Sequence, residues 1–88
     1  MKDFYITKNK GYRINFFYKG KHYSIQECGE LYEEFVSLKC KEDQNFYKTI
    51  CYGHIPALIK ISKRGETYRD ADMAQLFKII EEYIEKDC

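Results

Sequence analysis

The sequence predicts an α+β fold, in which an antiparallel sheet of about four strands carries two helices on one face. Two observations lead to this prediction. Apolar and polar residues alternate with a period of two in the strand-like stretches, and apolar residues recur every three or four positions in the helix-like stretches. In chain order these stretches follow the pattern ββαββα. We expect residues 1–88 to form a single domain, because a chain of 88 residues is long enough for one small core.

The first two strands are expected to form a hairpin within GYRINFFYKGKHYSIQ, residues 11–26. A two-residue turn at Lys19–Gly20 makes Tyr18 and Lys21 neighbours across this hairpin. Alternation then gives a core face of Ile14, Phe16, Tyr23 and Ile25, and an opposite face of Arg13, Asn15, Phe17, His22, Ser24 and Gln26. A slip of one residue would mix the two sets, so the pattern also predicts the register. A short extra strand at Phe4–Thr7 is the alternative to a sheet of only four strands.

The first helix is expected at about residues 29–42, within CGELYEEFVSLKCKEDQ. An apolar stripe at helical spacing runs through this segment, formed by Leu31, Tyr32, Phe35, Val36 and Leu38. Glutamates gather near the start of the segment, where the helix dipole favours negative charge. The spacing and the charge therefore both favour a helix here.

The second hairpin is expected from the stretches NFYKTICY and PALIKIS, which flank the turn-like GHIP. Pro56 lacks a backbone donor and belongs at the turn or at the start of the strand. The residues predicted to face the core are Ile50, Tyr52, Ala57, Ile59 and Ile61. Lys48 falls on the same face, so the alternation is less regular than in the first hairpin.

The last helix has the strongest helical pattern in the chain. Its apolar residues recur at spacings of three and four, and they are Met73, Leu76, Phe77, Ile80, Tyr83 and Ile84. Asp70 is predicted to be the N-cap, because aspartate at that position accepts hydrogen bonds from unpaired N–H groups. The preceding KRGE segment is expected to be a loop.

The net charge is only +1, but the charge is unevenly distributed along the chain. Residues 1–26 carry +5 and residues 44–69 carry +4, whereas residues 27–43 and 70–88 carry −4 each. The predicted strands are therefore basic and the predicted helices acidic. Lysines on exposed strands also discourage aggregation, so solubility alone is a competing explanation of this pattern.

With both helices on one face, the opposite face of the sheet would be basic and aromatic. The residues predicted to bind a ligand on this face or beside it are Arg13, Phe17, His22, Tyr47, Lys60, Lys63 and Arg64, with Lys19 and Lys21 nearby. Cations interleaved with aromatic rings suit single-stranded nucleic acid, because each nucleotide offers a phosphate and a base to stack. An RNP1-type string, a helix-turn-helix and a zinc finger are not recognisable in the sequence.

Metal and catalytic constellations are weak. Cys51 and His54 have a C-x-x-H spacing, but structural zinc sites use two such close pairs. His22, Cys28 and Cys40 are the remaining candidate ligands. No third group is evident that would orient Cys51 and His54 for nucleophilic catalysis. We therefore predict no metal site and no cofactor, and a protein that is not an enzyme.

An anion site is a further candidate, because Lys63, Arg64 and Arg69 precede the start of the last helix. Asp70 and Asp72 occupy that helix start and would repel phosphate, so a charged loop is the simpler interpretation. The first residues lack the apolar run of a signal peptide, and no stretch is long and apolar enough to cross a membrane. We expect a cytoplasmic protein whose four cysteines stay reduced.

Two functional hypotheses remain. The leading one is a small non-enzymatic regulatory protein, of the bacterial or phage inhibitor type, that docks on a larger protein or nucleoprotein machine. The small size and the two oppositely charged faces motivate it, although the resemblance to such inhibitors is one of size and charge only. The alternative is a module that binds single-stranded nucleic acid through its basic sheet face. The sequence does not predict the oligomeric state.

Overall fold

The computed structural model describes residues 3–10, 13–27, 35–51, 61, 65 and 67–86 of the chain. Within these ranges the chain forms five strands and then a helix. The strands are β1 (Phe4–Lys10), β2 (Arg13–Tyr18), β3 (Lys21–Glu27), β4 (Phe35–Cys40) and β5 (Tyr47–Cys51). The helix is α2 (Asp70–Ile80), and it continues directly into a π-helical turn, η3 (Glu81–Glu85).

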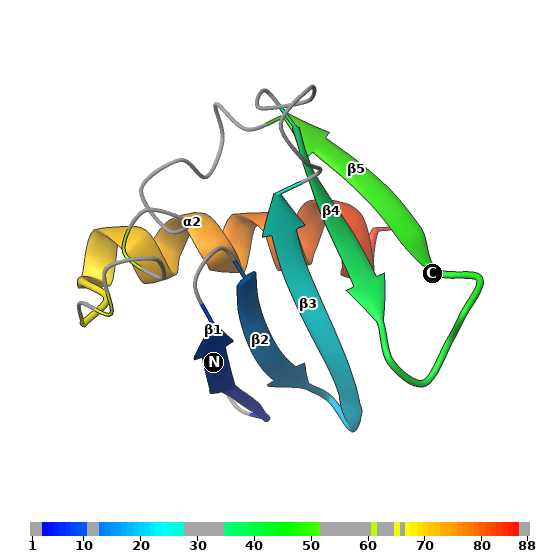
Figure 1. Ribbon diagram of the computed structural model, residues 1–88, viewed down its shortest axis with the longest axis horizontal. Helices are drawn as coiled ribbons and strands as arrows, with labels where there is room; N and C mark the ends of the chain where they lie inside the picture. Colours follow the sequence, from blue (N-terminus) through cyan, green and yellow to red (C-terminus); the bar gives the residue numbers. More distant parts are fainter. Residues whose placement is uncertain are drawn as a thin grey trace.

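The five strands form one antiparallel sheet in the order β1-β2-β3-β4-β5. Each strand therefore pairs with its neighbour in sequence, and α2 crosses one face of the sheet (Figure 1). The predicted α+β class is confirmed. The predicted count of about four strands and the order ββαββα are wrong, because the sheet has five strands among the described residues. None of the described helices is long and apolar enough to cross a membrane.

The β2–β3 hairpin has the predicted register. Tyr18 pairs with Lys21, and the pairing continues without a shift to Arg13 opposite Gln26. Lys19 and Gly20 have φ angles of 47° and 85°, so both turn residues adopt the left-handed conformation of a type I′ turn. This turn matches the twist of the strands and fixes the register of every side chain in the hairpin.

The strand at the N-terminal edge is also present and is longer than the alternative prediction of Phe4–Thr7. Its register with β2 shifts between Ile6 and Lys8, which indicates a β-bulge. The side chain of Asn15 donates a hydrogen bond of 2.6 Å to the carbonyl oxygen of Lys8 on the far side of this bulge. The carbonyl oxygen of Lys8, beside the bulge, thus has a side-chain hydrogen-bond donor.

The predicted helix at residues 29–42 is wrong where the structure describes it, because residues 35–40 form β4. Val36, Leu38 and Cys40 alternate on the core side of this strand and are buried. The same residues fit a helical stripe, since a short apolar run matches both periods. Pairing with β3 on one side and β5 on the other decides the conformation. Residues 29–34 of the predicted helix lie outside the described residues.

The predicted second hairpin falls only in part on the described residues. β5 forms as expected and pairs with β4. The carbonyl of Ile61 accepts a hydrogen bond from the N–H of Gly65 at 2.8 Å, which is the i→i+4 pattern of a helical turn and excludes a strand there. Ile50 and Ile61 are buried as predicted. Tyr52, Pro56, Ala57 and Ile59 lie outside the described residues.

The predicted N-cap is wrong by one residue. Arg69 occupies the cap position, and Asp70 is the first residue of α2. The carboxylate of Asp72 accepts hydrogen bonds from the backbone N–H of Arg69 at 3.1 Å and from its guanidinium at 3.2 Å. These two hydrogen bonds lower the pKa of Asp72, the backbone N–H contributing most. Asp72 lies at the third helical position, where a carboxylate completes a capping box.

The core lies between the sheet and the helix. The helix contributes Leu76, Ile79, Ile80 and Ile84, and the sheet contributes Ile14, Phe16, Tyr18, Tyr23, Ile25, Val36, Leu38, Cys40 and Ile50. Met73, Phe77 and Tyr83 are half-buried and pack against this cluster. The predicted core faces of the first hairpin and of the last helix are therefore confirmed.

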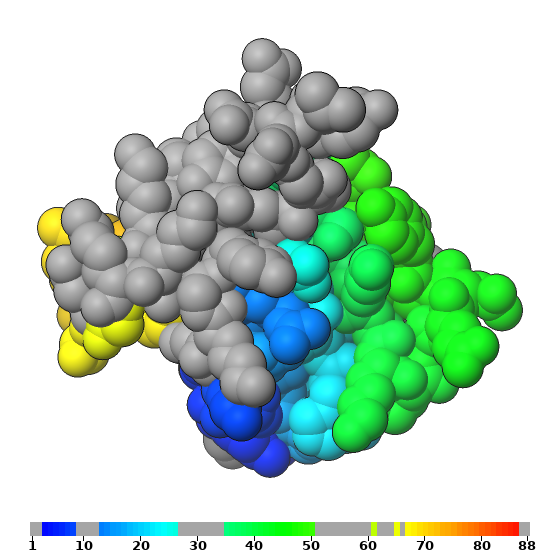
Figure 2. Space-filling view, viewed as in Figure 1, coloured from blue at the N-terminus to red at the C-terminus, as the bar shows by residue number. Residues whose placement is uncertain are grey.

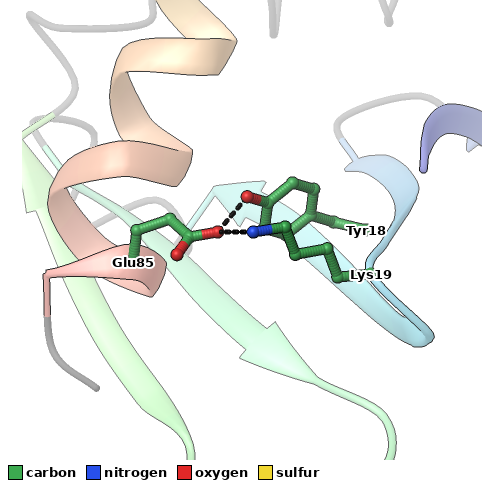
Figure 3. Close-up of polar contacts among 3 residues, drawn as sticks. All are labelled: Tyr18, Lys19 and Glu85. Atoms are coloured by element: carbon green, nitrogen blue, oxygen red, sulfur yellow. Dashed lines mark hydrogen bonds and ion pairs between the residues drawn. The ribbon is translucent and has the colours of Figure 1, made fainter. Parts of the chain in front are cut away.

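The end of the helix is tied to the β2–β3 turn by polar contacts (Figure 3). The buried Tyr18 hydroxyl donates a hydrogen bond to the carboxylate of Glu85, and the Lys19 ammonium lies 2.9 Å from the same oxygen. Both donors lower the pKa of Glu85. Burial and the nearby carboxylate raise the pKa of Tyr18, and the carboxylate raises that of Lys19. This contact holds η3 against one end of the sheet.

Candidate functional site

One face of the sheet packs on α2, and the other face, here called the open face, is turned away from the helix. Figure 2 shows side chains of β1 to β5, coloured from dark blue to green, at the surface on this side. Alternation and register place the following described residues on the open face: Tyr5, Lys8, Arg13, Asn15, Phe17, His22, Ser24, Gln26, Lys39, Tyr47 and Thr49. Apolar neighbours of these residues, such as Ile14, Phe16, Ile25 and Leu38, belong to the core.

Three rings form an aromatic row across β1, β2 and β3. The rings of Tyr5 and Phe17 are stacked, with centroids 4.8 Å apart and planes inclined by 22°. His22 meets the other side of Phe17 edge-on at 5.4 Å. Tyr5 is 54% exposed, although large aromatic side chains are usually covered. The aromatic row therefore offers an ordered ring surface to the solvent.

His22 is held by Glu42, which follows β4. The backbone N–H of His22 donates a hydrogen bond to the Glu42 carboxylate, and the ring Nδ1 lies 3.0 Å from its second oxygen. These contacts lower the pKa of Glu42, the backbone N–H contributing most. The pair fixes the imidazole at the end of the aromatic row and places one carboxylate at this edge of the open face.

A hollow of about 540 Å³ lies beside the aromatic row. It is lined by Thr7, Lys8, Arg13, Asn15, His22, Tyr23, Ser24, Lys39, Cys40 and Lys41. We call it the basic hollow, because its described lining residues include three lysines and an arginine and no carboxylate. Its volume falls within the range of ligand pockets. Short polar side chains, Asn15 and Ser24, lie between the longer cationic ones, so the lining suits an oxyanion such as a phosphate.

Tyr47 lies on the other side of the basic hollow, on β5. It is 55% exposed, and the ammonium of Lys39 lies 5.7 Å from the centre of its ring. The register places Ser24 beside Lys39 and Lys39 beside Tyr47. A polar serine, a cation and an exposed ring thus follow one another across three adjacent strands.

A second hollow, of about 510 Å³, lies over the helix and differs in its charge. Its lining includes Lys78 and Lys86, but also Glu81 and Glu82. Among the described residues, cations and carboxylates of equal number face this space, so this part of its lining has no preference for an anion. The basic hollow on the open face is the better candidate for a site that binds phosphate.

The structure brings four of the predicted binding residues together. Arg13, Phe17, His22 and Tyr47 lie on the open face, and their role in binding stays a prediction. Lys60, Lys63 and Arg64 lie outside the described residues. Two cations that were expected near a binding surface have other partners: Lys19 contacts Glu85, and Arg69 contacts Asp72.

Sequence reasoning missed Tyr5, Lys8, Lys39 and Lys41. The alternation of Phe4, Tyr5 and Ile6 contained the signal for the first of these, since apolar neighbours on either side direct Tyr5 outward. The two lysines of the segment 39–41 were assigned to an acidic helix. Lys39 lies in β4 and Lys41 directly follows it, so both lysines line the basic hollow instead.

The candidate zinc ligands are not brought together where the structure describes them. His22 is exposed on the open face, whereas Cys40 belongs to the buried core on the opposite face of the sheet. Cys28 and His54 lie outside the described residues, and the side chain of Cys51 is not described. Within the described ranges, no cluster of three His, Cys, Asp or Glu side chains could hold a metal ion.

Comparison of the chain with protein-family models, with curated proteins and with solved structures finds no match. The chemistry of the open face is therefore the basis for a functional proposal.

Proposed function

We propose that the protein binds single-stranded nucleic acid on the open face of its sheet, without catalysis. One observation carries the proposal: exposed aromatic rings lie on two sides of a hollow that is lined with cations and, in the part of the chain that the structure describes, with no carboxylate. Proteins that hold single strands combine a positively charged groove with rings on which bases stack. This combination of features supports nucleic acid more specifically than either feature alone.

The rings would supply most of the affinity for bases. Each stacked base contributes about 1–3 kcal/mol in proteins of this kind, and the interaction tolerates any base because every base has a π-face. Tyr5 and Phe17 already stack on each other, so little conformational entropy is lost when a base is added. The ring of Tyr47 has the Lys39 ammonium beside it, and this cation–π contact restricts the orientations of the ring before a base is added.

The cations would hold the phosphates. Lys8, Arg13, Lys39 and Lys41 come from β1, β2 and β4 and its following residue, and the sheet brings them around one space. The hydroxyl of Ser24 can donate a hydrogen bond to a phosphate oxygen in the middle of this set. Stacking requires bases that are accessible from their faces, so the proposal favours single strands over duplexes. A cytoplasmic location, where such strands occur, is part of this proposal.

The test is fluorescence anisotropy with a labelled single-stranded DNA, the same sequence as RNA, and the DNA duplex. The expected result is that one or both single strands bind more tightly than the duplex and retain part of their affinity at moderate salt. Variant Tyr47→Ala should weaken single-strand binding about fivefold or more. Thr49→Ala on the same strand and face is the matched control and should leave the affinity unchanged. Equal binding of duplex and single strand would contradict the proposal.

Docking on a protein machine is the second proposal, and the exposed acidic residues at the far side of the molecule favour it. Asp70, Glu81 and Glu82 are exposed along α2 and η3. A small regulatory protein of the bacterial or phage type could present these carboxylates to a basic channel of its target. The test compares the binding of variants to the target protein. If the double variant Glu81→Lys, Glu82→Lys no longer binds the target while open-face variants still bind it, docking is favoured over nucleic-acid binding.

A further inference from the structure

We infer that the single strand crosses the sheet at a large angle to the β-strands, with a phosphate in the basic hollow and bases on the rings at its two sides. This inference rests on the proposed function and specifies the path and the footprint of the ligand. One base would stack at the Tyr5–Phe17 end of the aromatic row, and another on Tyr47. One of the intervening phosphates would contact the lysines and the arginine of the hollow.

The register supports a path across the strands. Lys8, Asn15, Ser24, Lys39 and Tyr47 are successive partners from β1 to β5 and so form one line perpendicular to the strands. Along this line the side chains change from a cation at one edge, through small polar groups, to a cation and an exposed ring at the other edge. A polynucleotide lying along this line would meet cations and hydrogen-bonding groups suited to its phosphates, and a ring suited to one of its bases.

The alternative is a path parallel to the strands, toward Lys41 and the end of β4. This path is less favourable for phosphate. The Glu42 carboxylate is held there by the backbone N–H of His22 and by its ring. A fixed negative charge next to the hollow repels a phosphodiester at that edge. The carboxylate therefore directs the phosphates away from His22 and leaves the route from Tyr47 toward Tyr5 and Phe17.

The footprint follows from the geometry of the sheet. Phe17 on β2 and Tyr47 on β5 are separated by three strand spacings, which amount to about 14 Å. Stacked nucleotides advance about 3.4 Å each along one strand. The two ring surfaces are therefore about four nucleotides apart for a stacked strand, and fewer for a stretched one. The site should thus be short, and its full affinity should be reached by an oligonucleotide of about five nucleotides.

The test is a length series of oligo-dT, from about two to about twelve nucleotides, measured by anisotropy at constant salt. The affinity of the wild-type protein is expected to rise steeply up to about five nucleotides and then to increase only in proportion to the number of overlapping sites. Tyr47→Ala should remove the steep rise, because only the Tyr5–Phe17 end then offers a ring surface. Phe17→Leu should reduce the rise, because Tyr5 then lacks its stacked partner. Lys39→Gln should instead weaken binding at every length.

Thr49→Ala is the control for Tyr47→Ala, and thermal unfolding monitored by circular dichroism shows whether each variant is folded. Affinity that continues to rise steeply beyond about eight nucleotides would overturn the inferred path, because the ligand would then extend beyond the two ring surfaces. A steep rise that persists in Tyr47→Ala would overturn it as well. Absence of binding at every length would instead contradict the proposed function itself.

Discussion

The ring of Tyr5 on the edge strand stacks on the ring of Phe17 on the next strand, with centroids 4.8 Å apart. The register places these two residues directly opposite each other. Both rings lie on the face away from the helix, so their contact is not part of the main core. An ordered pair of rings at the surface has a stabilising contribution of its own, and it is also the first half of the proposed binding surface.

The first prediction concerns Phe17. Replacing it with leucine keeps an apolar side chain on β2 but removes the face on which a base can stack. Single-strand affinity is expected to fall about five- to 100-fold. The melting temperature should change little, since Phe17 is only half-buried and Ile14, Phe16 and Tyr18 still form the core.

Anisotropy and thermal unfolding of Phe17→Leu measure the two quantities separately. Thr49→Ala serves as the control on the same face. An unchanged affinity in a folded Phe17→Leu protein would show that the aromatic row does not take part in binding.

The second prediction concerns the salt dependence of binding. If Lys39 contacts a phosphate, the slope of log K against log salt for a single strand should become shallower by about 0.7 in Lys39→Gln. Lys78 on α2 also is an exposed lysine but lies over the helix, so Lys78→Gln should leave the slope unchanged. Equal effects of the two variants would indicate general attraction to a basic protein and would argue against a phosphate contact in the basic hollow.

The third prediction concerns pH. Hydrogen bonds from Tyr18 and Lys19 lower the pKa of Glu85 below its ordinary value of 4.5. A carboxyl group whose pKa is lowered by folding stabilises the fold above its unfolded pKa, and this contribution is lost as the pH falls through the folded value. The free energy of unfolding should therefore decrease below about pH 4.5, and it should decrease less in Glu85→Gln.

Urea unfolding at neutral pH and below about pH 4 measures this difference. Glu82→Gln alters another exposed carboxylate of η3 and is the matched control. The same pH dependence in wild type and Glu85→Gln would show that the contact between Tyr18 and Glu85 does not persist in solution.

The fourth prediction concerns the packing of the helix on the sheet. Leu76 is fully buried in the core, and Leu76→Ala should lower the free energy of unfolding by about 2–5 kcal/mol. That is a large part of the 5–15 kcal/mol expected for a small domain. Gln75→Ala, at the neighbouring exposed position, should change it by less than about 0.5 kcal/mol. Urea unfolding would show similar midpoints for the two variants if α2 did not pack on the sheet.

The sequence predicted those parts of the fold in which local rules agree. The β2–β3 register followed from a turn of suitable residues and a strict alternation, and both act within the hairpin itself. The apolar face of α2 followed from a long helical stripe. In these elements the local pattern leaves one conformation that also buries the apolar side chains.

The segment around Val36 and Leu38 shows the limit of such reasoning. Its short apolar pattern fits a helix and a strand equally well, and contacts with β3 and β5 make it a strand. Those contacts join this segment to its two neighbouring strands, so the pattern within residues 35–40 alone does not reveal them. Because of this error, sequence reasoning missed Lys39 and Lys41. Lys39 lies on the open face only because residues 35–40 form a strand.

The most direct test of the central claim is a titration of ¹⁵N-labelled protein with a short oligo-dT, followed by two-dimensional amide NMR. Binding on the open face should shift the amide signals of Tyr5, Phe17, Ser24, Lys39 and Tyr47, and should leave those of Gln75 and Lys78 on α2 nearly unchanged. Shifts confined to α2 and η3, or no shifts at any concentration of the oligonucleotide, would contradict the claim that this sheet face binds single-stranded nucleic acid.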